Sequence, residues 1–214
     1  MTEYHKIDSI YKRDPSGKRM LFGDFSRPEF EYLQACEWQW TEKVDGTNVR
    51  VMWDGERVSF GGKTDNAQMP LQLIECLQDL FPAEKMAAAL KGPMVLYGEG
   101  YGPKVQSGGW YRSDAGFILF DAFAGDVWLT RLTLEDLSAE LSIDLVPLVG
   151  VGTLTAACEY VMRRSVSVVA KVERRPMEGL VMRPLYELRD RRGSRIITKI
   201  KVKDFAERQA EGAR

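Results

Sequence analysis

The residues with the clearest capacity for chemistry are lysines and glutamates that stand next to glycines. The foremost is the lysine in the run Glu42-Lys43-Val44-Asp45-Gly46-Thr47-Asn48. A neutral lysine amine is a nucleophile that forms covalent intermediates, and a nearby glycine allows tight backbone geometry. A pattern of lysine, any residue, aspartate and glycine also recurs by chance. Its meaning therefore depends on what the rest of the chain supplies.

A second group of lysines follows the alternation of a strand near the end of the chain. The pattern over 195–203 predicts two faces, one with Ile196, Thr198, Ile200 and Val202, the other with Ile197, Lys199, Lys201 and Lys203. Three ammonium groups on one face repel one another unless an anion lies over them, and a polyphosphate would serve. An edge strand whose lysines prevent aggregation is an equally good interpretation of this pattern alone.

Two glutamates are flanked by glycine at the ends of β-rich runs. Glu99 stands between Gly98 and Gly100, and Glu178 stands before Gly179. Such carboxylates can hold ribose hydroxyls or a divalent cation, although each one alone also fits an ordinary turn.

An aromatic run over 117–123 is a further candidate for ligand contact. Its alternation predicts Asp121 on the face of Phe117 and Leu119, with Phe120 on the other face. One of these rings could stack on a base, while most aromatic side chains in such a run belong to the core.

Composition excludes several rival chemistries. His5 is the only histidine, which argues against a Ser-His-Asp triad and a His-rich zinc site, and we expect it in a solvated N-terminal segment. The three dispersed cysteines argue against a disulfide framework and favour a reducing, cytoplasmic location. No stretch approaches the length of a membrane span. Because the net charge is −1, nucleic-acid contact would need a local basic patch, such as the cluster over 189–203.

The elements that must position these residues follow from periodicity and turn signals. We expect strands at 48–53, 57–61, 94–98, 117–123, 179–183 and 195–203, with Asp54-Gly55 forming a hairpin turn between the first two. We expect helices at 71–80, 83–90, 134–141 and 154–164, the third capped by Thr133 with Asp136. Hairpins and separate helices indicate an α+β fold with antiparallel sheets.

The motifs together carry a resemblance that none carries alone. Lys-x-Asp-Gly, a Gly-Glu-Gly strand end, an aromatic strand with Asp, Glu-Gly and a Lys-x-Lys strand follow one another from Glu42 to Phe205. This order resembles the covalent nucleotidyltransferases, which comprise RNA ligases, DNA ligases and mRNA capping enzymes. Within them the chain resembles the RNA ligase family, of the bacteriophage RNA ligase 2 type. The resemblance implies one ATP-grasp-like ligase adenylation domain over 1–214, with antiparallel β-sheets flanked by helices and without an appended C-terminal domain.

The resemblance also implies roles for individual residues. Lys43 would attack the α-phosphate of ATP, carry AMP as a phosphoramidate and pass it to a 5′-phosphate end, which a 3′-OH then joins. Lys199 and Lys201 would be catalytic at the α-phosphate. Cofactor binding would involve Glu42, Asn48, Lys63, Glu99, Phe120, Glu178, Lys199 and Lys201. Glu178 and Glu99 would also bind Mg²⁺ or Mn²⁺, Glu99 would contact the ribose, and Phe120 would stack on the adenine.

One departure and two alternatives accompany the resemblance. Lys63 stands where the family usually has an arginine, and lysine keeps the charge without the bidentate fork. The expected partners are RNA ends, with nicked duplexes and DNA ends left open, and no membrane. The alternatives are a DNA or mixed polynucleotide ligase, and a non-catalytic nucleic-acid-binding module that uses the basic residues at 189–203.

Overall fold

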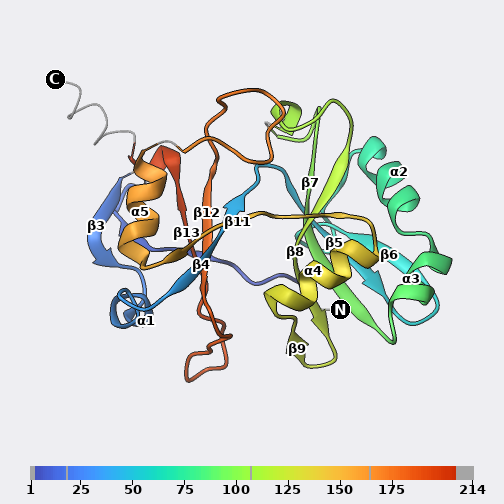
Figure 1. Ribbon diagram of the computed structural model, residues 1–214, viewed down its shortest axis with the longest axis horizontal. Helices are drawn as coiled ribbons and strands as arrows, with labels where there is room; N and C mark the ends of the chain where they lie inside the picture. Colours follow the sequence, from blue (N-terminus) through green and yellow to red (C-terminus); the bar gives the residue numbers. More distant parts are fainter. Residues whose placement is uncertain (1–2, 18, 107, 164, 206–214) are drawn as a thin grey trace. The chain divides into compact units, whose positions relative to one another are not determined.

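The chain is built from two compact units whose segments interleave along the sequence. The computed structural model describes residues 3–17, 19–106, 108–163 and 165–205. Unit 1 comprises Met1–His5, Val44–Val146 and Val169–Glu173, and unit 2 comprises Lys6–Lys43, Pro147–Val168 and Arg174–Arg214. Each unit has its own sheet (Figure 1). The predicted α+β fold with antiparallel sheets is confirmed, and the single domain over 1–214 stays a prediction.

The sheet of unit 1 has six strands. In spatial order β10, β8, β7, β5 and β6 lie side by side, and β9 pairs with β8. The β5–β6 hairpin turns at Asp54-Gly55 as predicted, with Trp53 opposite Val58. The strand bounds are β5 Thr47–Trp53, β6 Val58–Gly61, β7 Met94–Tyr101, β8 Gly116–Ala124, β9 Val127–Trp128 and β10 Asp144–Leu145.

Three helices of unit 1 pack on one face of that sheet. They are α2 Leu71–Leu80, α3 Ala83–Ala89 and α4 Arg131–Glu140 (Figure 1). Their buried side chains share one core with alternate residues of the strands, so none of these three α-helices covers the opposite face of the sheet. This core includes Leu73 and Leu77 of α2, Met86 of α3, Leu134 and Leu137 of α4, and Val49, Val51, Leu96, Phe117 and Leu119 of the sheet.

Helix α4 begins three residues earlier than predicted. The Thr130 side chain accepts a hydrogen bond from the backbone N–H of Thr133, so Thr130 is the N-cap. The predicted cap by Thr133 with Asp136 is therefore wrong. Both threonines satisfy the sequence rule, and Leu134 and Leu137 reach the core in either case.

A β-bulge in β8 changes which residues share a face. Tyr97 pairs with Asp121 and Gly98 pairs with Leu119, so Phe120 is the extra residue. Asp121 consequently lies on the face of Phe120 and away from Leu119, which contradicts the predicted alternation. Its carboxylate accepts a hydrogen bond of 2.8 Å from the hydroxyl of Tyr4.

The N-terminal residues of unit 1 pack against this face of the sheet. The ring of Tyr4 lies 5.0 Å from the rings of both Tyr97 and Phe120. The ring of His5 lies 4.5 Å from Tyr4 and 5.7 Å from Trp128. The expected solvated segment around His5 is therefore wrong, because aromatic packing partly buries it.

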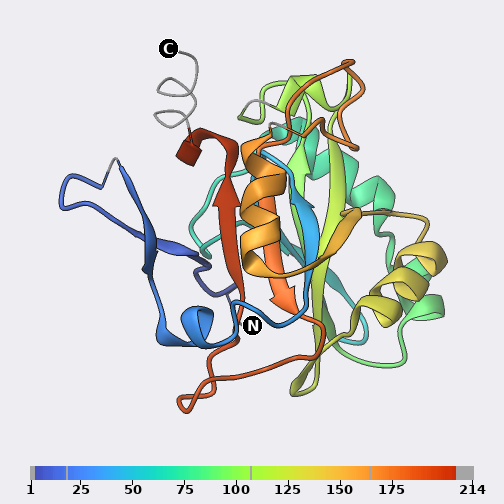
Figure 2. The same ribbon diagram turned by 60° about the vertical axis from the view of Figure 1, so that its left-hand side comes forward.

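The sheet of unit 2 has five strands in the order β1, β13, β12, β4 and β11. Helix α5 packs on one face, where Leu154, Ala157 and Val161 meet Trp40 and Leu180 (Figure 2). A separate hairpin joins β2 to β3. The bounds are β1 Asp8–Ser9, β2 Tyr11–Arg13, β3 Met20–Phe25, α1 Pro28–Tyr32, β4 Trp38–Lys43, β11 Leu148–Gly152, α5 Leu154–Met162, β12 Gly179–Pro184, β13 Thr198–Lys201 and the 3₁₀ helix Val202–Phe205.

Strand β13 is shorter than the predicted strand at 195–203. The backbone N–H of Lys201 donates to the carboxylate of Asp204, and that of Val202 donates to the carbonyl of Glu178. These bonds turn the chain into the 3₁₀ helix, so Lys203 lies off the strand and is exposed. Among the described residues, no helix is long and apolar enough to cross a membrane.

Candidate active site

The candidate nucleophile lies at the end of β4, which is next to the central strand β12 in the sheet of unit 2. In register, Lys43 of β4 is opposite Gly179 of β12, and Gly179 is opposite Lys201 of β13. A Cβ at Gly179 would overlap the backbone carbonyl of Ile200, so only glycine fits between the two lysine-bearing strands. Directly opposed residues of a sheet point to the same side, which brings the two lysines toward one another.

Glu178 joins these two lysines. Its Oε2 lies 2.8 Å from Nζ of Lys43 and its Oε1 lies 2.5 Å from Nζ of Lys201. All three side chains are largely buried, with 16–23% of their surface exposed. One carboxylate balances one of the two ammonium charges, so the cluster retains a net positive charge that suits a phosphate.

Lys199 lies on the same face of this sheet. It is opposite Val181 on β12, two residues from Lys201 along β13. The structure therefore brings Lys43, Glu178, Lys199 and Lys201 together on one side of three adjacent strands. Their roles in catalysis stay predictions.

Glu42 points to the other face of the sheet from Lys43. Its carboxylate is 1% exposed and accepts hydrogen bonds from the hydroxyl of Ser167 and, at 2.8 Å, from the backbone N–H of Val168. Within unit 2 this carboxylate fixes the segment after α5 against the end of β4. A cofactor-binding role for Glu42 stays a prediction.

Unit 1 gathers three other predicted residues on its helix-free face. Asn48 of β5 is directly opposite Glu99 of β7, and Glu99 is opposite Ile118 of β8. Phe120 follows on the same face and is half-buried. The Oδ1 atom of Asn48 is buried and has no hydrogen-bond partner among the described residues. An orphaned acceptor of this kind costs stability unless a ligand donates to it.

Lys63 lies on the exposed loop after β6. Sequence reasoning missed Arg50, which is 1% exposed and holds that loop. Its Nε donates to the carbonyl of Gly62 at 2.9 Å, and its Nη2 lies 2.6 Å from Oδ1 of Asp65. This hydrogen bond lowers the pKa of Asp65. An arginine inside an otherwise apolar strand is the signal that could have revealed it.

Tyr101 lies two residues after Glu99, also on β7. Burial raises its pKa to about 12, and the nearby carboxylate of Asp144 contributes in the same direction. The Tyr101 hydroxyl lies 3.1 Å from Asp144. The phenol therefore stays protonated at neutral pH and serves as a hydrogen-bond donor, not as a base.

Among the described residues, a metal ion would have carboxylate ligands but no complete set of protein ligands. The described residues contain no group of three or more His, Cys, Asp or Glu side chains placed to hold a metal. Mg²⁺ usually keeps several waters and binds through one or two carboxylates together with substrate phosphates. A lone Glu178 or Glu99 fits that mode of binding.

The comparisons with known proteins concern the family and the fold of the chain. The sequence profile of the family described as RNA ligase matches residues 36–201. The chain belongs to the RNA ligase family. No curated protein sequence matches it.

Solved structures of the Naegleria gruberi RNA ligase have the same fold. A variant with ATP and Mn is 18% identical, with a TM-score of 0.65 over 86% of this chain and 54% of that chain. The protein with PPi is 19% identical, with a TM-score of 0.64 over 86% and 55%. A variant with AMP and Mn is 19% identical, with a TM-score of 0.63 over 85% and 54%. The chain thus spans about half the length of these proteins.

Proposed function

We propose that this protein is an ATP-dependent RNA ligase that forms a lysyl-AMP intermediate on Lys43. The observation that carries the proposal is the cluster of Lys43, Glu178 and Lys201 at the ends of β4, β12 and β13. Family membership supports the reaction class. ATP and Mn or AMP and Mn accompany the Naegleria enzyme, which supports the same cofactors here.

The first step joins Nζ of Lys43 to the α-phosphorus of ATP. The new P–N bond forms as the P–O bond to pyrophosphate breaks, and the amine gives up one proton to solvent. A free lysine has a pKa of about 10.4, so the neutral amine must be favoured by nearby positive charge. Lys201 supplies that charge, and Lys199 on the same strand face adds to it. The same ammonium groups stabilise negative charge that builds on the phosphate oxygens.

Glu178 holds both lysines in place before the reaction. Its two oxygens fix Nζ of Lys43 and Nζ of Lys201 on either side of one carboxylate. Glu178 is also the residue that would hold a divalent cation, which would neutralise phosphate charge when bound. In unit 1, we assign the ribose to Glu99, the adenine to Phe120 and a ligand hydrogen bond to Asn48, supported by their shared face and the orphaned Asn48 acceptor.

The test is transfer of α-labelled ATP to the protein with Mg²⁺ or Mn²⁺. We expect an alkali-stable, acid-labile adduct, as a P–N bond requires, that Lys43→Ala abolishes and Lys203→Ala preserves, because Lys203 lies off the strand. Absence of a Lys43-dependent adduct would overturn the proposed function.

The sealing steps need their own assay, because the relatives are longer than this chain. We propose RNA 3′-OH and 5′-phosphate ends as substrates and the cytoplasm as the location. Matched nicked duplexes and single strands with RNA or DNA on the 3′-OH side would decide the substrate. Equal sealing of DNA would favour the mixed ligase, and salt-sensitive binding without adduct would favour the non-catalytic module.

A further inference from the structure

Unit 2 contains a cavity that the proposed active-site residues do not line. Its volume is about 480 Å³, and it lies between α1 and the segment that connects β12 to β13. Its lining combines apolar and aromatic side chains with two arginines. The lining side chains that matter here are Tyr32, Leu33, Leu188, Arg189, Arg191 and Ile196.

The connecting segment is a built turn. The carboxylate of Asp190 accepts the backbone N–H groups of Arg192 and Ser194, each at 2.8 Å, and Gly193 takes a positive φ of 80°. A β-bridge pairs Arg189 with Arg195 at its base. These bonds fix the directions in which the turn presents its side chains.

Arg27 ties this turn to α1. Its Nη2 lies 2.9 Å from Oδ2 of Asp190, its Nη1 donates to the carbonyl of Arg195 and its Nε donates to Glu29. The two acidic residues that line the cavity, Glu29 and Asp190, are therefore both paired with one arginine, which balances one of their two negative charges.

Two cations and an aromatic ring remain available at the cavity. Arg189 and Arg191 are exposed and form no ion pair with any described residue. Tyr32 is 87% exposed, and Leu188, which also lines the cavity, is 38% exposed. Like charges held close together repel one another, and a large exposed aromatic ring gains nothing from the fold, so both features are better satisfied by a ligand.

We propose that this cavity binds a single-stranded segment of the RNA substrate, with a base stacked on Tyr32 and phosphates paired with Arg189 and Arg191. An aromatic platform beside arginines is the combination that holds unpaired nucleotides. Arginine also pairs phosphate in a bidentate manner. This assignment rests on the proposed function, because RNA, the substrate of the proposed ligase, is the polyanion that the arginines would pair with.

The cavity is remote from the lysine cluster within the same unit. Strand β12 begins beside Glu178 and ends at Pro184, and the turn leaves from that far end (Figure 2). Six residues of extended strand span about 20 Å. The site would therefore hold RNA several nucleotides away from the reacting end, and it would affect RNA binding without affecting AMP transfer.

The experiment measures fluorescence anisotropy of a labelled single-stranded RNA of about 16 nucleotides with the full chain, without ATP, over a series of salt concentrations. We expect Tyr32→Ala to weaken binding about tenfold. We expect Arg189→Ser with Arg191→Ser to lower the slope of log K against log salt by about 1.4, which is two contacts at about 0.7 each.

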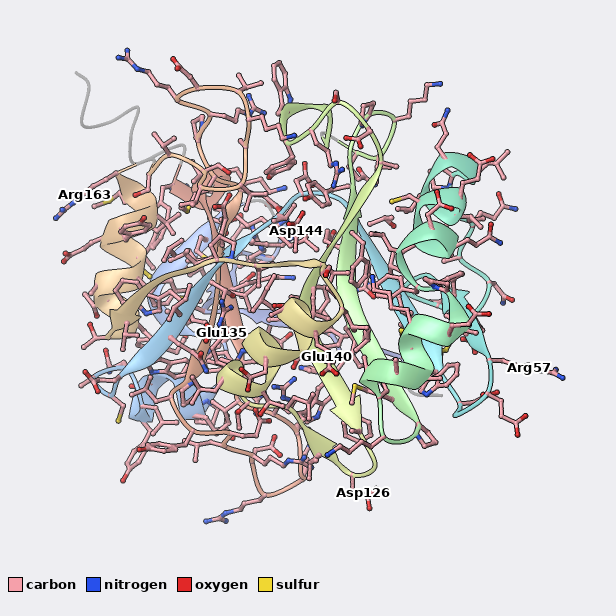
Figure 3. All side chains as sticks on the ribbon, turned by 45° about the vertical axis from the view of Figure 1, so that its right-hand side comes forward. Arg57, Asp126, Glu135, Glu140, Asp144 and Arg163 are labelled. Atoms are coloured by element: carbon pink, nitrogen blue, oxygen red, sulfur yellow. The ribbon has the colours of Figure 1, made fainter. Side chains whose placement is uncertain are left out.

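Two controls separate this site from a general loss of charge or of activity. Arg163→Ser removes an exposed arginine of unit 2 at the end of α5 and should leave both quantities unchanged (Figure 3). Adduct formation with labelled ATP should be unchanged in every cavity variant. An adduct-forming wild type whose RNA affinity and salt slope are unaltered by the cavity variants would overturn the site alone.

The class of partner is tested by competition. Polyglutamate carries charge but no bases, so it should not respond to Tyr32→Ala and should displace the RNA poorly. If polyglutamate binds as tightly as the RNA and loses affinity equally in the variants, the cavity recognises acidic protein segments, and the assignment to RNA is wrong.

Discussion

Each sheet has one face that carries the predicted site residues, but the polar groups on the two faces differ in whether they have partners. In unit 2 the polar groups are paired with one another, since Glu178 holds Lys43 and Lys201 in ion pairs. In unit 1 the face has an acceptor on Asn48 that no described residue satisfies, and the same face carries the aromatic ring of Phe120. A paired cluster stabilises the fold and must be rearranged for reaction, whereas an orphaned acceptor costs stability and favours ligand binding.

The largest effect should come from Lys201→Ala. Removing one group that stabilises charge in the transition state costs about 100-fold in rate, so adduct formation with labelled ATP should fall by that factor. Lys203→Ala is the matched control, since that lysine follows two residues later but lies in the 3₁₀ helix and is exposed. Equal losses in the two variants would show that general positive charge matters, not the pairing with Glu178.

Glu178→Gln should separate stability from catalysis within unit 2. The variant removes the carboxylate that pairs with two poorly exposed ammonium groups, so the free energy of unfolding should fall by about 2 kcal/mol, and adduct formation should fall by less than in Lys201→Ala. Urea denaturation measures the first quantity. Glu187→Gln is the control, because it removes the partner of Arg195 and should lower stability while preserving the adduct. Unchanged stability in Glu178→Gln would contradict a preformed cluster.

Asn48→Ala in unit 1 should have the opposite pattern of effects, with little change in stability and a clear loss of ATP binding. Because Oδ1 of Asn48 has no partner among the described residues, the free energy of unfolding should change by less than about 0.5 kcal/mol. The loss of one hydrogen bond to the nucleotide should weaken ATP binding by about tenfold in calorimetry. A large loss of stability with unchanged ATP affinity would show that Asn48 has a structural role. The difference between the paired cluster of unit 2 and the unpartnered acceptor of unit 1 would then not hold.

The smallest effect should come from Tyr4→Phe. It deletes the hydroxyl that donates to the buried Asp121 and should lower the free energy of unfolding by about 1 kcal/mol. Because the ring that packs against Phe120 remains, ATP affinity should persist in this variant and fall in Tyr4→Ala. Tyr32→Phe, at an exposed site, should leave stability unchanged. A loss of ATP affinity in Tyr4→Phe would show that the hydroxyl itself positions the ligand.

Elements with a strong local pattern could be predicted from the chain. The bounds of α2 agree with the predicted 71–80, since an amphipathic pattern follows Pro70 directly. The strands at β5, β6, β7, β8 and β12 lie where apolar, β-branched and aromatic residues gather. Strand β4, which carries Lys43, was not among the predicted strands although Trp38 and Trp40 alternate with polar residues.

Other features depend on distant partners and left no local signal. Strand β1 has only two residues and pairs in parallel with Thr198 and Lys199 of β13, some 190 positions along the chain. The bulge at Phe120 reverses the face of Asp121, because an extra residue breaks the period of two. A local pattern cannot indicate where a ladder inserts such a residue.

The sequence by itself determined the family to which the chain belongs, because a lysine, acids and a lysine-bearing strand in one order are set by residue type and spacing. Tertiary structure decided which of these groups meet. Registers across β4, β12 and β13 place Glu178 between Lys43 and Lys201, and the turn at Asp204 removes Lys203 from them. The physical reason is that side-chain chemistry is local to a residue, whereas electrostatic pairing depends on distances that only strand register and hydrogen-bonded turns fix.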